Sequence, residues 1–174
     1  MRKMLISDLA DADLSERRVL VRVDYNVPLE DGRVSDDTRI RATLPTLEYL
    51  LERRARIILT SHLGRPKGGP DPRYSLRPAA ERLGELVSAP VHFVSDVIGA
   101  DARAAVDRLA PGEILLLENV RFLPGEEKND AELSRQLAGF ADIYVNDAFG
   151  SAHRAHASTA GAAEVMKARH CPAV

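Results

Sequence analysis

Four short apolar runs, each followed at once by polar residues, constrain the fold of this 174-residue chain more than any other feature. The runs cover residues 19–23, 57–60, 114–117 and 143–145. They are rich in Val, Ile and Leu and do not alternate strictly with polar residues. That pattern is typical of strands that are buried on both faces of a parallel sheet. A weaker fifth candidate strand covers residues 91–94.

Segments with helical periodicity lie between the apolar runs. The first covers residues 38–54, with Asp36, Asp37 or Thr38 as its N-cap and a kink rather than a break expected at Pro45. Alternating strands and helices predict right-handed βαβ units. We therefore expect an α/β fold with a doubly wound parallel sheet, Rossmann-like, in three α/β/α layers. The other predicted helices cover residues 76–87, 100–109, 130–140 and 156–167.

The length of the chain suits one domain, which we expect to span residues 1–170. Residues 171–174 begin a new segment without a helix cap, so we interpret them as the start of an interdomain region. The single cysteine, Cys171, cannot form an internal disulfide, which fits a reducing compartment. With no signal peptide pattern and no apolar stretch of membrane-spanning length, we expect a cytoplasmic protein.

Charge and composition argue against several classes of function. The 24 basic and 26 acidic residues nearly balance, and there are only four Tyr, four Phe and no Trp, which disfavours a nucleic-acid-binding protein. His153 and His156 lack a third ligand at a suitable spacing, so we predict no metal site. Neither a phosphate-binding P-loop nor a dinucleotide-binding glycine motif is present.

Polar and cationic residues follow the predicted strands. In an open parallel sheet, ligands bind in the crevice outside the carboxyl ends of the strands, so these residues should converge. Because most of them are cationic, we expect the ligand to be a small anion held by guanidinium forks. The residues are Asp24 and Asn26 after the first run, Arg39 in the first turn of the next helix, His62 and Arg65 after the second run, Arg121 after the third, and Arg154 at the start of the last helix.

Each of these residues also has a simpler interpretation. Asp24 and Asn26 equally fit a turn closed by side-chain hydrogen bonds before Pro28. A single arginine is more often a solvated surface residue than a ligand. Four arginines and a histidine at predicted strand and helix ends favour a binding site over a set of unrelated surface residues.

Five stretches carry a resemblance to a known family. With residues 19–28, 37–40, 61–68, 117–122 and 146–156, the chain resembles the N-terminal domain of phosphoglycerate kinases. These stretches are long, follow the family's order and extend over nearly the whole chain.

The resemblance implies a role for each candidate residue. Arg65, Arg121 and Arg154 would hold the non-transferred phosphate of 3-phosphoglycerate or 1,3-bisphosphoglycerate. Asp24 and Asn26 would lie near the hydroxyl and carboxyl end, with His62 also binding the substrate. Arg39 would bind substrate and reach the transferring phosphoryl group, which makes it the one catalytic residue expected here.

The resemblance also implies what this chain does not contain. Members of the family are glycolytic, monomeric kinases with a second domain that binds Mg-ADP or Mg-ATP, and no counterpart of that domain is present. We therefore expect a chain that binds the triose substrate, holds no cofactor or metal and is inactive alone, its partner being the missing nucleotide domain. The family's returning C-terminal segment is missing as well, so we expect Val165 and Met166 to be exposed. The alternative is a stand-alone anion-binding or regulatory module.

Overall fold

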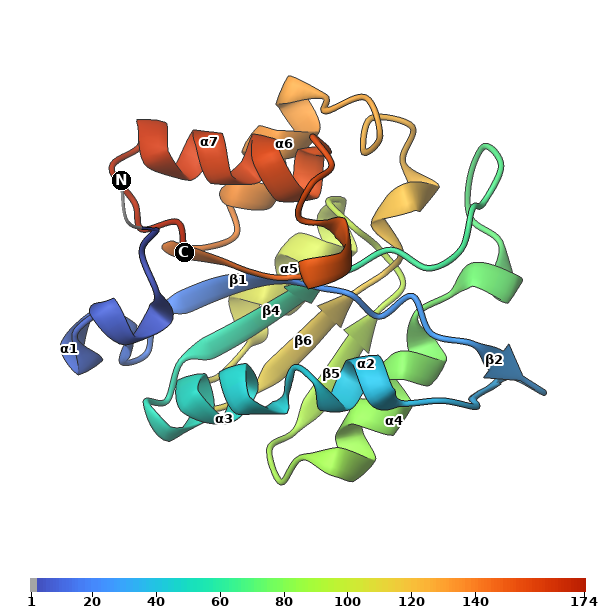
Figure 1. Ribbon diagram of the computed structural model, residues 1–174, viewed down its shortest axis with the longest axis horizontal. Coiled ribbons are helices and arrows are strands. Elements are labelled where there is room, and N and C mark those ends of the chain that lie inside the picture. The colour runs from blue at the N-terminus through green and yellow to red at the C-terminus, as the bar shows by residue number, and fades with distance from the viewer. Residues whose placement is uncertain (1–2) are drawn as a thin grey trace.

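The computed structural model describes residues 3–174 and arranges them in three layers, with a parallel sheet between two layers of helices (Figure 1). The sheet has five strands in the spatial order β5-β6-β4-β1-β7. The predicted doubly wound α/β fold is confirmed, and the weak fifth strand is present at the edge of the sheet. The strands are β1 (Arg18–Val23), β4 (Arg56–Thr60), β5 (Val91–Val94), β6 (Ile114–Leu117) and β7 (Ile143–Asp147).

Successive residues of the central strands face opposite helical layers. In β1, Val19 and Val21 belong to one apolar core, whereas Leu20 belongs to the other. The same alternation places Ile57 in the first core and Ile58 in the second. Because both faces of these strands are covered, nearly every position must be apolar, and this explains the continuous apolar runs.

Helices cover both faces of the sheet (Figure 1). Leu50 and Leu83 from one set and Val106 and Leu137 from the other contribute buried side chains to the two cores. Among the helices of residues 3–174, none is both long and apolar enough to cross a lipid bilayer. The helices are α1 (Asp11–Leu14) before the sheet, then α2 (Thr38–Arg41), α3 (Leu44–Glu52) and α4 (Arg77–Leu86) on one face, and α5 (Ala100–Arg108), α6 (Ala131–Ala138) and α7 (Ala162–Ala168) on the other.

The segment predicted as one kinked helix is two helices. α2 ends at Arg41, and α3 begins at Leu44 with Pro45 in its first turn. Proline is tolerated there because the first N–H groups of a helix have no intrahelical acceptor. The expected kink at Pro45 was therefore wrong. Arg39 nevertheless lies in the first turn of α2, as predicted.

The last helix also differs from its prediction. A π-helical turn, Ala157–Gly161, precedes α7, so Arg154 lies in a turn before the helical segment and not at its start.

Met166 is completely buried in the second core, which corrects the expectation that it is exposed. α7 packs against α6, and the second core of the same chain covers the Met166 side chain.

A short antiparallel hairpin, β2 (Leu29–Glu30) and β3 (Arg33–Val34), was not predicted. Its turn residues Asp31 and Gly32 have φ values of 50° and 74°. A two-residue turn of this kind needs positive φ at both positions, which an Asp-Gly pair supplies. That pair is the sequence signal that would have predicted the hairpin.

The final residues lie alongside the edge strand β7. The Tyr144 backbone N–H donates to the Pro172 carbonyl at 3.0 Å, and the Val174 N–H donates to the Tyr144 carbonyl at 2.8 Å. The backbone of β7 is thus partly paired on the side away from β1.

Candidate functional site

The carboxyl ends of four strands meet at one edge of the sheet. Parallel pairing places Arg22 of β1 opposite Thr60 of β4 and Asn146 of β7. β6 is held in register with β4 through the Leu59–Leu116 pair. The segments that follow these strands therefore begin at the same edge, and they carry all of the predicted site residues except Arg39, which α2 brings to that edge.

Asp24, Asn26 and Arg39 form one side of the site. Arg39 Nη1 donates to Asp24 Oδ1 at 3.2 Å and to the Asn26 carbonyl at 2.9 Å. The Asn26 N–H donates to Asp24 Oδ1 at 3.2 Å, so the turn expected from the simpler interpretation is also present. The Arg39 side chain is 52% exposed. Its guanidinium is tethered at one end and open to a ligand.

Arg121 is the most enclosed of the predicted arginines. Its side chain is only 6% exposed, and its Nε lies 3.3 Å from Glu127 Oε1. Nη1 donates to the Gly64 carbonyl at 3.0 Å. Burial lowers the pKa of Arg121, Glu127 opposes this effect, and Arg154 and Arg65 lower the pKa further. Arg65 and Arg154 therefore both lie close enough to Arg121 to repel its charge.

Asn119 and Asn26 hold the loop after β4 in place. The Asn119 amide donates to the carbonyls of Leu63 and Tyr74 at 2.7 and 2.9 Å. The Asn26 side-chain carbonyl accepts from the Gly64 N–H at 2.8 Å. Gly64 thus touches Asn26 on one side and Arg121 on the other, and it links the two sides of the site.

Gly64 is a position where a side chain cannot be added without strain. Its φ is +62°, and a Cβ built there would lie 2.4 Å from Cδ1 of Tyr74. We expect Gly64→Ala to lower the free energy of unfolding by about 1–2 kcal/mol for the backbone conformation, with a further ~1–3 kcal/mol for the clash. Urea unfolding measures the total.

Gly68→Ala is the matched control. Gly68 has a φ of +75°, but a Cβ added there would meet no atom within 4 Å, so this variant measures the backbone cost alone. Equal losses in the two variants would contradict the steric argument for Gly64.

His62 is buried beside several cations. Its side chain receives a hydrogen bond at Nδ1 from Arg22 Nη2 at 2.9 Å. Burial, followed by the charges of Arg22, Arg121 and Arg154, lowers the pKa of His62 from 6.5 to about 3. His62 is therefore a neutral imidazole at physiological pH, and it can offer a ligand a hydrogen bond but no positive charge.

The lowered pKa of His62 makes folding sensitive to acid. The unfolded chain binds a proton below pH 6.5 that the folded chain does not bind until about pH 3. The contribution of neutral His62 to the free energy of unfolding is therefore fully present above pH 6.5 and is lost as the pH falls from 6.5 toward about 3. We expect His62→Asn to flatten the slope of the unfolding free energy between these pH values. His156, whose pKa is also lowered by burial, keeps some slope. An unchanged slope in His62→Asn would contradict the assignment.

Three buried polar residues that were not predicted from the sequence form a hydrogen-bonded chain that ends at His62. Arg22, Glu126 and Ser158 are at most 1% exposed, and Ser158 bridges the other two. An arginine inside the apolar run of residues 19–23 is the signal that could have drawn attention to the first of them. No local pattern marks Glu126 or Ser158, which lie 32 residues apart.

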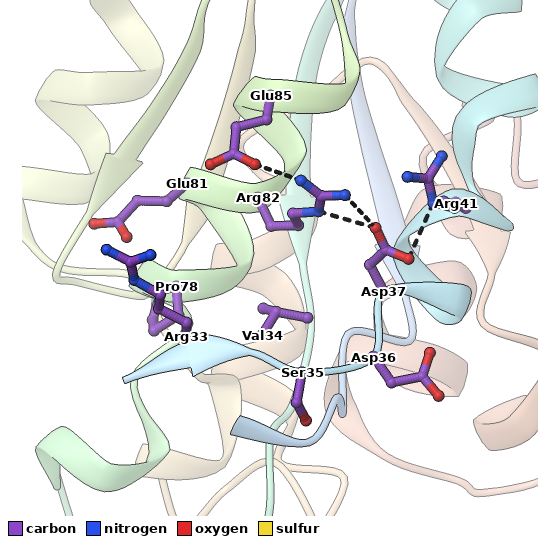
Figure 2. A pocket seen from close by; sticks show the side chains of 10 residues that line it. All are labelled: Arg33, Val34, Ser35, Asp36, Asp37, Arg41, Pro78, Glu81, Arg82 and Glu85. Atoms are coloured by element: carbon purple, nitrogen blue, oxygen red, sulfur yellow. Dashed lines mark hydrogen bonds and ion pairs between the residues drawn. The ribbon is translucent and has the colours of Figure 1, made fainter. Parts of the chain in front are cut away.

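A polar groove of about 750 Å³ lies beside this site, between the β2–β3 hairpin, α2 and α4 (Figure 2). Asp37 accepts from Arg41 Nε at 3.0 Å and lies 2.8 Å from Arg82 Nη2. The hydrogen bond from Arg82 is the main cause of the lowered pKa of Asp37. Arg82 also pairs with Glu85. These contacts tie α2, which carries Arg39, to α4.

Comparison with known proteins relates nearly the whole chain to one family. The family model described as phosphoglycerate kinase matches residues 9–172. Phosphoglycerate kinase of Desulforudis audaxviator is 58% identical over 172 residues, which are 98% of this chain and 42% of the relative. That of Thermomicrobium roseum is 62% identical over 156 residues, or 90% of this chain and 40% of the relative. The chain thus spans about two fifths of the length of these relatives.

Two solved structures share the fold. Phosphoglycerate kinase from Coxiella burnetii superposes with a TM-score of 0.80 at 38% identity, covering 93% of this chain and 39% of the other. The enzyme from Pyrococcus horikoshii OT3 gives a TM-score of 0.82 at 34% identity, covering 95% and 41%.

Proposed function

The chain belongs to the phosphoglycerate kinase family, and on that premise we propose that it binds the triose substrate of such a kinase. The ligand is 1,3-bisphosphoglycerate when the phosphoryl group passes to ADP, and 3-phosphoglycerate when it passes from ATP in the reverse reaction. The observation that carries this proposal is the convergence of cations at one edge of the sheet: Arg65 and Arg154 both lower the pKa of Arg121, and Arg121 and Arg154 both lie near the neutral His62. Arg65 and Arg154 each repel Arg121, and a dianionic phosphate bound among the three arginines offsets that repulsion.

The two sides of the site suit the two ends of the ligand. Arg65, Arg121 and Arg154 hold the phosphate that stays on the triose. Asp24 and Asn26 lie beyond Gly64, where they meet the hydroxyl and carboxyl end. Arg39 is on the same side and half exposed, so it is free to reach the phosphoryl group in transfer. In this assignment Arg39 is the catalytic residue of the chain.

The chemistry asks the protein for alignment and charge neutralisation. The attacking group is a carboxylate oxygen of 3-phosphoglycerate, which is already ionised at neutral pH. It forms a bond to the terminal phosphorus of the nucleotide as the bond to the bridging oxygen breaks. No proton has to be removed, so arginines and a neutral histidine suffice and no general base is needed.

In this proposal the nucleotide does not bind to the 174 residues of this chain. Within residues 3–174, no group of three or more His, Cys, Asp or Glu side chains is placed to hold a metal ion. We place Mg-ADP or Mg-ATP on the part of the relatives that this chain does not match. We accordingly expect the chain alone to bind the triose substrate without catalysing phosphoryl transfer. We also expect the protein to be located in the cytoplasm.

Calorimetric titration of the 174-residue chain with 3-phosphoglycerate tests the proposal. We expect binding in the micromolar to millimolar range that weakens as salt is raised, because charge-assisted contacts are screened. Glycerate, which lacks the phosphate, is the matched control ligand and should bind far more weakly. The absence of binding at millimolar 3-phosphoglycerate, or equal binding of glycerate, would remove the phosphate assignment.

A further inference from the structure

A chain of buried polar groups runs from Glu126 through Ser158 and Arg22 to His62. Ser158 Oγ donates to Glu126 Oε2 at 2.5 Å and accepts from Arg22 Nε at 2.8 Å. Arg22 Nη2 then meets His62 Nδ1 at 2.9 Å. All four side chains are buried, with His62 the most exposed at 6%. Buried polar networks of this kind hold their members in one arrangement when every group is paired.

The direction of the last hydrogen bond is determined by chemistry. A guanidinium has only donors and keeps its protons at any physiological pH, so Arg22 must donate to His62. Nδ1 therefore carries a lone pair, and the single ring proton of the neutral imidazole is on Nε2.

The other ring nitrogen is free to act on a ligand. His62 Nε2 has no hydrogen-bond partner among residues 3–174. It is also not buried from solvent, unlike the few side-chain nitrogen and oxygen atoms that lack a partner inside the described part of the chain. The cations that face the ring are Arg22, Arg121 and Arg154, and His156 is also close. An N–H donor at this point adds to the arginines as a ligand for an anion without adding a charge.

The same network holds the arginine-bearing loops in place. The Ser158 N–H donates to Glu126 Oε1 at 2.7 Å, and the Ala157 N–H donates to the Glu126 carbonyl at 2.9 Å. Glu126 is in the loop that follows Arg121, and Ala157 and Ser158 follow Arg154. One buried carboxylate therefore ties the segment of Arg121 to the segment of Arg154.

We infer that Arg22, held by Ser158 and Glu126, is a positioning residue that sets His62 as the Nε2–H tautomer and so makes it a hydrogen-bond donor to the bound anion. Arg22 itself contacts no ligand in this inference. Its relevance to 3-phosphoglycerate rests on the proposed function, whereas the tautomer is a property of the ligand-free chain.

Long-range ¹H–¹⁵N spectra of the histidine rings test the inference on the ligand-free chain, with His62→Asn used to assign the signals. We expect the nitrogen shifts of a neutral Nε2–H ring at pH 7. Ser158→Ala removes only the bridging hydroxyl and should let a second tautomer appear. Arg22→Met should produce a tautomer mixture, and Arg22→Lys, which restores one charged donor, should recover Nε2–H. Glu132→Gln, an exposed carboxylate change on α6, should leave the ring signals as in the wild type.

Titration with 3-phosphoglycerate supplies the functional half of the test. In Ser158→Ala and Arg22→Met we expect the affinity to fall by about tenfold, the effect of one hydrogen bond to a charged group. An Nδ1–H ring or an imidazolium in the wild type at pH 7 overturns the inference, even if Arg22→Met fails to fold. An unchanged Nε2–H tautomer in folded Arg22→Met also overturns it. If the wild-type ring is Nε2–H but 3-phosphoglycerate does not bind, the proposed function fails and the tautomer assignment stands.

Discussion

Arg121→Ala is expected to weaken the binding of 3-phosphoglycerate by about 10- to 100-fold, since a hydrogen bond to a charged group contributes roughly 1.5–3 kcal/mol. Arg121 is the least exposed arginine of the proposed phosphate site and is anchored to the Gly64 carbonyl. Its guanidinium therefore loses little freedom when a ligand binds. Calorimetric titration at constant salt measures the change.

Three further variants sharpen this prediction. Arg121→Lys keeps the charge but loses the planar fork, so its affinity should lie between those of the wild type and Arg121→Ala. Arg135→Ala is the matched control, because it removes an equal charge from α6, where Arg135 pairs with Glu132. An equal loss of affinity in Arg135→Ala would mean that net charge, and not the site, determines binding. Arg39→Ala should have a smaller effect on ground-state binding than Arg121→Ala.

Glu126→Gln is expected to lower the free energy of unfolding by about 2–4 kcal/mol, because removing one partner of a buried charge pair leaves the other uncompensated. The opposite charge is that of Arg22, which is 1% exposed and is linked to the completely buried Glu126 through Ser158. Burial lowers the pKa of Arg22, and the charge of Glu126 is the largest effect that opposes it. Urea unfolding measures the loss.

The double variant tests whether charge is the cause. Adding Arg22→Met to Glu126→Gln removes the uncompensated cation, so the double variant should be more stable than the sum of the two single losses predicts. Glu132→Gln, in which an exposed carboxylate is neutralised, should change the unfolding free energy by less than about 0.5 kcal/mol. Additive losses in the double variant would indicate that Glu126 acts through packing alone.

Strand and helix positions were largely predictable because local patterns determine them. The runs at residues 57–60 and 114–117 are almost continuously apolar, as burial on both faces requires, and both are strands of the sheet. The errors fall where a local rule was applied too generally or missed. Pro45 begins a second helix and does not bend a single one, and the Asp31-Gly32 turn was overlooked although its signal is local.

The sequence by itself determined that cationic residues follow parallel strands, because chain direction brings the carboxyl ends of such strands to one edge. It thereby predicted that Arg65, Arg121 and His62 share a site. Only the tertiary structure decided how each residue is held and charged. The low pKa of His62, its contact with Arg22, and the bridge from Ser158 to Glu126 depend on burial and on contacts across as many as 136 residues. Desolvation and long-range hydrogen bonds have no local pattern, so the folded chain alone reveals them.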